Sequence, residues 1–316
     1  MVFLFAGLGL VILLLAGDAL VKGAVNLSLR LGVPALIVSL TIVAFGTSAP
    51  ELLISIKAAL DGVPGIALGN VIGSNTANVL LVLGIPAMIA VMHTAGHDTR
   101  TSYLQMMGGT VLFIALAYRG IFDFWAGILL LAGLIAILGS AFVTAMAHRK
   151  AGEADPDLEE PEGADPDING WKIALYLGLG LAGLPLGADL LVDSATEIAR
   201  MYNVPDTVIG LSLVAIGTSL PELATTVAAA LRRQADVALG NVIGSNMFNL
   251  LAIIGVASLI APMPVDPALL QFDLWVMLAA SLLLVPFVFM GQNLNRVWGI
   301  VLTLLYAGYL AMVLTV

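Results

Sequence analysis

The sequence predicts an all-α membrane protein with ten transmembrane helices, arranged as two inverted-topology five-helix repeats. Three observations predict this fold class: the composition, a series of apolar spans and an internal duplication. Hydrophobic residues make up 60% of the 316 residues and charged residues only 10%, against about 45–50% and about 25% in soluble domains. A soluble fold could not bury so much apolar surface, so we expect the chain in a membrane.

Ten apolar stretches approach the roughly 20 residues that a helix needs to cross a bilayer. The first stretch contains no Lys or Arg before Lys22 and carries Asp18, which argues against a cleaved signal peptide. The longest stretches must tilt or include turns that do not span. In chain order, the predicted spans are 2–28, 34–60, 65–91, 102–118, 123–147, 171–200, 205–231, 236–261, 269–290 and 296–315.

The basic residues predict the orientation of the chain. With the N-terminus outside, nine of the 12 Lys and Arg residues fall on the cytoplasmic side, as the positive-inside rule requires. We therefore expect both termini outside and the segment between the halves in the cytoplasm. The cytoplasmic set is Lys22, Arg30, Arg100, Arg149, Lys150, Lys172, Arg232, Arg233 and Arg296, and the outer set is Lys57, Arg119 and Arg200.

An internal duplication relates the two halves of the chain. After a shift of 171 residues, 41–84 aligns with 212–255 without a gap, with 23 identities in 44 positions. Each half holds five spans, an odd number, so the second half must enter the membrane from the opposite side. Substrate sites of such inverted repeats lie near the midplane, where the repeats meet. The predicted domains are a first repeat at 1–147, an acidic cytoplasmic linker at 148–170 and a second repeat at 171–316.

Each copy of the duplication carries an acid within an apolar span. The order Gly-Thr-Ser-x-Pro-Glu ends at Glu51 in the second span and at Glu222 in the seventh. A carboxylate there is costly unless it is paired, protonated or bound to a cation. Pro50 and Pro221 remove backbone donors and disturb the carbonyls one turn earlier. Hard cations such as Na⁺ and Ca²⁺ take carboxylate and carbonyl oxygens as ligands, so the motif predicts a cation site.

A second motif supplies further oxygen atoms. Gly-Ser-Asn-x-x-Asn places its Ser and its last Asn four positions apart, on one face of a helix. A lone Ser or Asn in a membrane helix more often joins helices than binds an ion. The duplication at identical spacing beside an acid favours ligands instead. The four residues predicted to line one cavity are Ser74, Asn78, Ser245 and Asn249.

Two further acids match across the duplication, Asp18 in the first span and Asp189 in the sixth. Both lie deep enough in their predicted spans for a role in ion binding or transport. A helix-capping or packing role is the interpretation we favour for the pair, and a functional role stays open.

Other classes of protein fit the sequence poorly. The chain has no Cys, which excludes disulfides and thiolate sites, and a net charge of −9 gives no nucleic-acid footprint. An intramembrane hydrolase built on Ser48 or Ser219 would need a base, but His93, His97 and His148 fall outside the duplicated segments 41–84 and 212–255. We therefore expect that the protein is not an enzyme and has no cofactor, although it would bind the ions that it transports. We expect membrane lipid around it and no obligatory protein partner.

The paired signatures resemble a known family. GTSAPE with GNVIGSNTAN, and GTSLPE with GNVIGSNMFN, are similar to the two alpha repeats of the cation/calcium antiporter superfamily, and most similar to the prokaryotic sodium/calcium exchangers. The resemblance implies a sodium/calcium antiporter of the cell inner membrane that works by alternating access. It also implies that spans one and six are gating helices that slide against the other eight.

The resemblance further implies a set of ligands. Some exchangers, including potassium-dependent ones, carry Asp at the position of Asn249, so the amide here argues against potassium dependence. Calcium would bind the two glutamates, and sodium would compete for them with additional oxygens. The implied set is Glu51, Glu222, the carbonyls of Thr47, Thr218, Ala44 and Ala215, the hydroxyls of Ser48, Ser74, Ser219 and Ser245, and the amides of Asn78 and Asn249.

Two rival functions share much of this chemistry. A calcium/proton exchanger of the same fold would alternate protons and calcium on the glutamates, although a proton carrier needs no extra shell of oxygens. A passive cation channel would use similar ligands in a pore. Calcium flux under sodium, potassium or proton gradients separates the exchangers, and saturable exchange without conductance excludes the channel.

Overall fold

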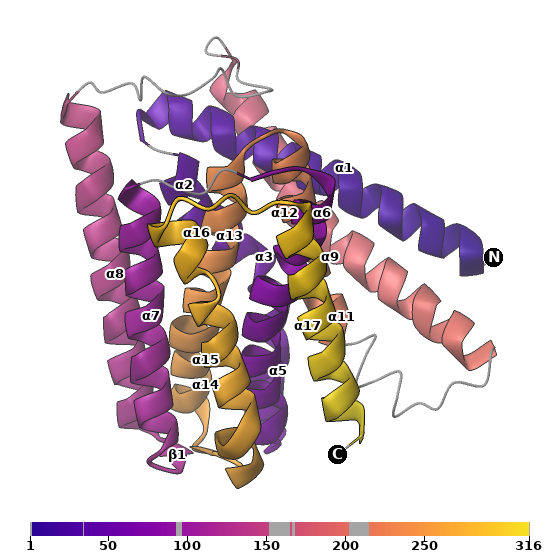
Figure 1. Cartoon of the computed structure of the whole chain (residues 1–316), viewed down its shortest axis with the longest axis vertical. Coiled ribbons are helices and arrows are strands. Elements are labelled where there is room, and N and C mark those ends of the chain that lie inside the picture. Colours follow the sequence, from indigo (N-terminus) through magenta and orange to yellow (C-terminus); the bar gives the residue numbers. More distant parts are fainter. Residues whose placement is uncertain are drawn as a thin grey trace.

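The computed structural model describes residues 2–33, 35–92, 97–151, 165, 168–201 and 215–315. Most of the predicted linker and the first part of the predicted seventh span lie outside these residues, as does His93. The described chain is a bundle of helices with one antiparallel pair of two-residue strands (Figure 1).

The first half contains eight α-helices, two π-helical segments and one strand among its described residues. A π-helical turn is wider than an α-helical turn and is common at functional sites. The elements are α1 (Val2–Leu31), α2 (Ala35–Val38), η1 (Ser39–Val43), α3 (Ala44–Thr47), α4 (Ala49–Leu60), α5 (Pro64–Ala77), η2 (Asn78–Val82), α6 (Gly84–Ile89), α7 (His97–Ala117), β1 (Ile121–Phe122) and α8 (Phe124–Ala151).

The described part of the second half repeats this order with variations. Its broken helix is followed by a long composite helix, as in the first half. The elements are α9 (Gly170–Met201), α11 (Ala215–Thr218), α12 (Leu220–Leu231), α13 (Ala235–Met247), η4 (Phe248–Ile253), α14 (Ile254–Ile260), β2 (Met263–Pro264), η5 (Leu269–Asp273), α15 (Leu274–Leu282), α16 (Val285–Phe289) and α17 (Arg296–Thr315).

Seven helical stretches of the described chain are long and apolar enough to cross a membrane. The bent pair 35–47 and 49–60 makes an eighth if it counts as one span. Two of the ten predicted spans are not in this set: 102–118 lies within α7, whose first turns are polar, and 205–231 is described only from Ala215 onward. The chain is therefore an all-α, multi-pass membrane protein, and the count of ten spans stays a prediction.

Helices α1 and α9 form a closely packed, inclined pair beside the rest of the bundle (Figure 1). Glycines set their approach: a Cβ on Gly180 would lie 2.8 Å from Leu20 Cα, and a Cβ on Gly187 would lie 2.9 Å from the Leu13 backbone nitrogen. Lipid tails are as apolar as the helices, so membrane helices associate through such close packing of small residues. These two helices cover the first and sixth predicted spans.

The two composite helices that carry the Gly-Ser-Asn-x-x-Asn motifs lie at the centre of the bundle. Of the 18-residue apolar window within each helix, 72% is buried in 64–89 and 78% in 235–260, against 17–39% for the windows of the other long spans. Gly244 brings α13 against the other half of the chain, because a Cβ there would lie 2.5 Å from the Leu40 carbonyl oxygen. The centre of the fold is therefore built by both halves together.

Candidate functional site

Both Gly-Thr-Ser-x-Pro-Glu motifs fold as a break in a helix. Ser48 separates α3 from α4 with φ −84° and ψ 7°, and Ser219 separates α11 from α12 with φ −88° and ψ 4°. The disturbance predicted from the prolines is thus confirmed, and the first break bends the helix by 47°. Glu51 and Glu222 lie in the first turn of the helix after each break. The positive end of a helix dipole there favours a negative charge.

The two glutamates are buried without a basic partner in the described chain. Glu51 is 1% exposed and Glu222 is 0% exposed. Ion pairs within 4.0 Å join Arg119 to Asp123 and Arg232 to Asp18, and neither includes one of the two glutamates. An unpaired buried carboxylate is expensive, so this arrangement requires a proton or a cation.

Side chains from both halves meet at Glu222. Its Oε1 accepts hydrogen bonds from Ser48 Oγ at 3.1 Å and from Ser245 Oγ at 3.4 Å. Ser245 Oγ also lies 3.4 Å from Thr47 Oγ1. Ser48 and Thr47 belong to the first half and Ser245 and Glu222 to the second, so these four predicted residues form one cluster built by both halves.

The carbonyl of Ala44 is already engaged in this cluster. It accepts hydrogen bonds from the backbone N–H of Ser48 at 3.0 Å and from Thr47 Oγ1 at 3.2 Å. A carbonyl oxygen has two lone pairs. A cation at Ala44 would therefore have to displace one of these donors.

Asparagines not predicted from the sequence hold the motifs together. Asn70 Nδ2 donates to the carbonyl of Glu51 at 3.5 Å, and Asn241 Nδ2 donates to the carbonyl of Glu222 at 3.3 Å. Asn75 and Asn246, the first asparagines of Gly-Ser-Asn-x-x-Asn, contact the last asparagine of the other half. Each of these asparagines has an asparagine at the matching position of the other copy, and this match is the sequence signal that could have identified them.

Five buried side-chain oxygens of the described residues have no hydrogen-bond partner. A buried acceptor without a partner destabilises a protein by about 1–3 kcal/mol. Five such oxygens together therefore favour binding of a proton donor or a cation. Every one of them belongs to a residue predicted as a ligand. They are Glu51 Oε2, Asn78 Oδ1, Ser219 Oγ, Glu222 Oε2 and Asn249 Oδ1. Two carboxylates, two amide oxygens and a hydroxyl match the ligand preference of a hard cation.

The other predicted residues lie on the same elements as the two motifs, Ser74 in α5 and Ala215 and Thr218 in α11. Ser74 is buried, and the backbone of Ala215 begins α11. Thr218 lines a cavity of about 130 Å³ beside the break in each half. Pro50 and Asp189 also line this cavity. Asp189 is therefore placed beside this cavity, whereas Asp18 Oδ1 forms an ion pair with Arg232 Nε at 2.6 Å.

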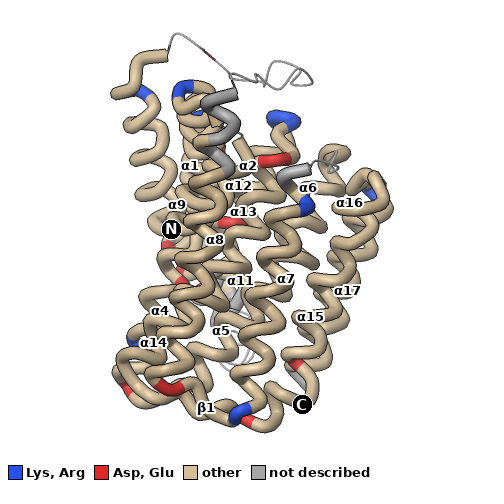
Figure 2. The backbone as a smooth tube through the Cα atoms, turned by 90° about the vertical axis from the view of Figure 1, so that its left-hand side faces the viewer, with Lys and Arg blue, Asp and Glu red and all other residues tan. Residues whose placement is uncertain are grey.

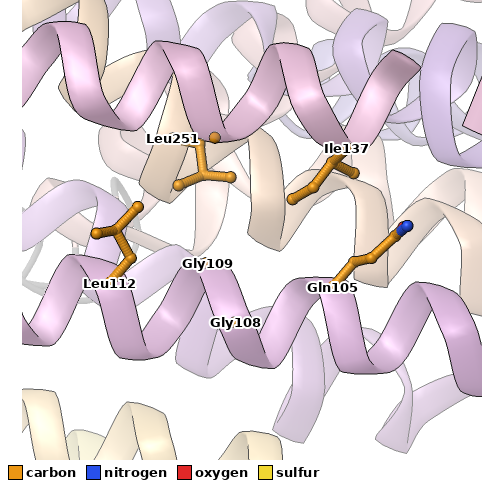
Figure 3. A pocket seen from close by; sticks show the side chains of 7 residues that line it. Gln105, Gly108, Gly109, Leu112, Ile137 and Leu251 are labelled. Atoms are coloured by element: carbon orange, nitrogen blue, oxygen red, sulfur yellow. The ribbon is translucent and has the colours of Figure 1, made fainter. Parts of the chain in front are cut away.

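A second cavity of about 260 Å³ lies between α7 and α8 and is apolar (Figure 3). Leu112, Ile137 and Leu251 line it, and Gln105 lies at one end. The Gln105 amide donates to Ser140 Oγ at 2.8 Å. This cavity holds no ionisable side chain and no residue of the predicted ligand set, so the cluster around Glu51 and Glu222 is the candidate ion site.

Comparisons with known proteins identify the family of this chain. The family described as sodium/calcium exchanger protein matches residues 1–143 and 172–315. The sodium/calcium exchanger MaX1 of Methanosarcina acetivorans is 34% identical, with 98% of this chain and 97% of that protein covered. The inner membrane protein YrbG of Escherichia coli is also 34% identical, with 87% and 85% covered.

A solved structure of the sodium-calcium exchanger NCX_Mj, soaked with Na⁺ and Ca²⁺, has the same fold. It superposes with a TM-score of 0.81 at 32% identity, and the match covers 98% of this chain and 99% of that one. Members of this family are membrane transporters rather than catalysts, and the multi-pass helices fit that role. From its matching sequence, fold and cluster of buried oxygens, this chain belongs to the sodium/calcium exchanger protein family.

Proposed function

We propose that the protein is a sodium/calcium antiporter that binds its two ions alternately between the glutamates of the two halves. The set of five unpartnered oxygens carries this proposal, because all five belong to the duplicated motifs. Oxygen ligands of this kind suit both Ca²⁺ and Na⁺. The family relationship supports the choice of these two ions.

Calcium would be held by the carboxylates, which neutralise its charge, and by amide and backbone oxygens. Sodium would use the same carboxylates with the nearby hydroxyls. One Ca²⁺ would neutralise the two carboxylates, whereas three Na⁺ would leave the site with one positive charge in excess. The ratio of sodium to calcium therefore decides whether each exchange cycle moves net charge across the membrane. The proposed ligands are Glu51, Glu222, Thr47, Thr218, Ser48, Ser219, Ser74, Ser245, Asn78, Asn249, Ala44 and Ala215.

The shared ligands give a physical reason for strict exchange. Both ions need Glu51 and Glu222, so they cannot be fully bound together. An empty site would leave two buried carboxylates without a counterion, which is costly to enclose on both sides. Only loaded states would therefore change the side to which they open, which couples the movement of one ion to that of the other.

In the proposed membrane orientation, the cavity of about 130 Å³ would lie on the outer side of the cluster. Most Lys and Arg residues gather at the end of the bundle near α2, α6 and α16, and fewer lie near β1 (Figure 2). The first end would face the cytoplasm under the positive-inside rule. Both termini would then lie outside an inner membrane, with ten spans in two inverted repeats and the 148–170 linker in the cytoplasm.

The sliding elements would be α1 and α9, which pack as a pair through glycines. Asp189 on α9 lines the proposed outer cavity together with Pro50 and Thr218. Movement of α9 relative to the cluster would therefore change access on that side. This assignment follows the gating role that the family resemblance implies for the first and sixth spans.

Equilibrium binding to the purified protein tests the shared site. Sodium should displace calcium competitively, so the apparent calcium dissociation constant should rise steadily with sodium concentration, while potassium at equal ionic strength should leave it unchanged. Calorimetric titration measures both series. Calcium binding that is insensitive to sodium, or equally sensitive to potassium, would contradict a shared site.

A further inference from the structure

We propose that Asn75 and Asn246 are positioning residues, which orient the amides of Asn249 and Asn78 so that oxygen, and not NH₂, faces the ions. The inference rests on the proposed function of the same site. It concerns two residues that lie outside the proposed ligand set. It explains why Asn78 Oδ1 and Asn249 Oδ1 are buried without a hydrogen-bond partner.

The NH₂ group of each ligand amide is bonded to the other half of the chain. Asn78 Nδ2 donates to Asn246 Oδ1 at 3.1 Å, and Asn249 Nδ2 donates to Asn75 Oδ1 at 3.0 Å. Each amide is planar, with its NH₂ and its oxygen on opposite sides. Fixing both NH₂ groups in this way therefore fixes both oxygens, Oδ1 of Asn78 and Oδ1 of Asn249, on the side that has no protein donor.

The positioning residues are themselves held by the backbone. Asn75 Nδ2 donates to the Asn246 carbonyl at 3.2 Å, and Asn246 Nδ2 donates to the Asn75 carbonyl at 3.4 Å. With their NH₂ groups committed to these carbonyls, they can offer only Oδ1 to the ligand amides. Asn75, Asn78 and Asn246 are 1% exposed and Asn249 is 0% exposed, so bulk water does not compete for these bonds.

A ligand asparagine needs this support more than a glutamate does. The two ends of an amide have nearly the same shape, so rotation by half a turn would exchange an acceptor for a donor. A donor NH₂ beside a cation replaces attraction with repulsion. A carboxylate presents oxygen in either orientation, and a hydroxyl can rotate its proton away. Among the proposed side-chain ligands, only Asn78 and Asn249 carry an amide.

The arrangement also makes each half dependent on the other. Asn75 of α5 orients Asn249 in η4, and Asn246 of α13 orients Asn78 at the start of η2. The oxygens are correctly placed only when α5 and α13 are docked. The ion site therefore requires that these two helices stay together as one unit while α1 and α9 move.

Two substitutions of Asn75 separate orientation from simple packing. Asn75→Leu and Asn75→Asp both remove the NH₂ donor to the Asn246 carbonyl, but only leucine also removes the acceptor for Asn249. We expect Asn75→Leu to raise the calcium dissociation constant about tenfold or more, and Asn75→Asp to keep it within about threefold or to lower it. Calorimetric titration with CaCl₂ on purified full-length protein measures both.

Matched controls keep the outcome interpretable. Thr76→Val changes the neighbouring buried residue, whose hydroxyl bonds only to the Ile72 carbonyl of its own helix, and should bind calcium as the wild type does. Equal losses in Asn75→Leu and Asn75→Asp, or no loss in either, would overturn the positioning role. If Asn75→Leu does not fold, the mirror pair Asn246→Leu and Asn246→Asp decides by the same comparison. Wild-type protein that binds no calcium would overturn the proposed function and this inference together.

Discussion

Glu222→Gln is expected to abolish sodium-dependent calcium transport. Glutamine keeps the size of the side chain but removes one of the two charges that balance Ca²⁺. It also weakens the acceptor for Ser48 and Ser245, whose hydroxyls lie 3.1 and 3.4 Å from Glu222 Oε1. Loss of one partner from a buried charge pair costs about 3–5 kcal/mol, which corresponds to about a 100-fold or greater rise in the calcium dissociation constant. Calcium uptake into proteoliposomes measures the loss.

Glu51→Gln should have an effect of the same size, because Glu51 is the matching carboxylate and its Oε2 is unpartnered. The control is Glu197→Gln, which removes one charge from an exposed position of α9 and should transport as the wild type does. Near-normal uptake by either Glu51→Gln or Glu222→Gln would remove that residue from the site.

Gly244→Ala should destabilise the protein and weaken the ion site. A Cβ at this position would lie 2.5 Å from both the Leu40 carbonyl oxygen and Ala44 Cβ. These atoms belong to the backbone and to a short side chain, so α13 and the η1–α3 segment would have to separate. Overpacking of this kind costs about 1–3 kcal/mol and would shift Thr47 and Ser48 away from Glu222. Thermal unfolding in detergent measures the first effect, and calcium titration measures the second.

The matched control is Gly139→Ala on the exposed face of α8, where a Cβ meets no described atom within 4 Å. Alanine favours a helix over glycine by about 1 kcal/mol, so this variant should be as stable as the wild type or more stable. If Gly244→Ala were equally stable and bound calcium normally, the close approach of α13 to the first half would not support the site.

The position of the glutamates could be predicted because it depends on local chemistry. Proline lacks an N–H and so favours a break in a helix, and the breaks at Ser48 and Ser219 lie two residues before Pro50 and Pro221. Proline alone does not cause a break, because Pro185 lies inside the continuous helix α9. The four-residue spacing of Ser245 and Asn249 likewise fixes one helical face. Duplication of both motifs then indicated that the two halves share one site.

The roles of Asn75 and Asn246 could not be predicted in this way. Their bonds run between the halves, so they depend on how α5 and α13 dock, which no spacing within one helix determines. The different surroundings of the matched aspartates Asp18 and Asp189 could not be predicted either, because they depend on residues in other helices. Asp18 pairs with Arg232 at the end of α12, but the position that matches Arg232 is Asp61, which cannot form an ion pair with Asp189.

Calcium uptake into proteoliposomes under single ion gradients tests the central claim of sodium/calcium exchange most directly. Vesicles containing the wild-type protein receive an outward gradient of sodium, of protons or of potassium in turn, with the membrane voltage held constant by an ionophore. We predict uptake with the sodium gradient alone, abolished by Glu222→Gln. Uptake driven by a pH gradient without sodium would contradict sodium coupling and establish a calcium/proton exchanger instead.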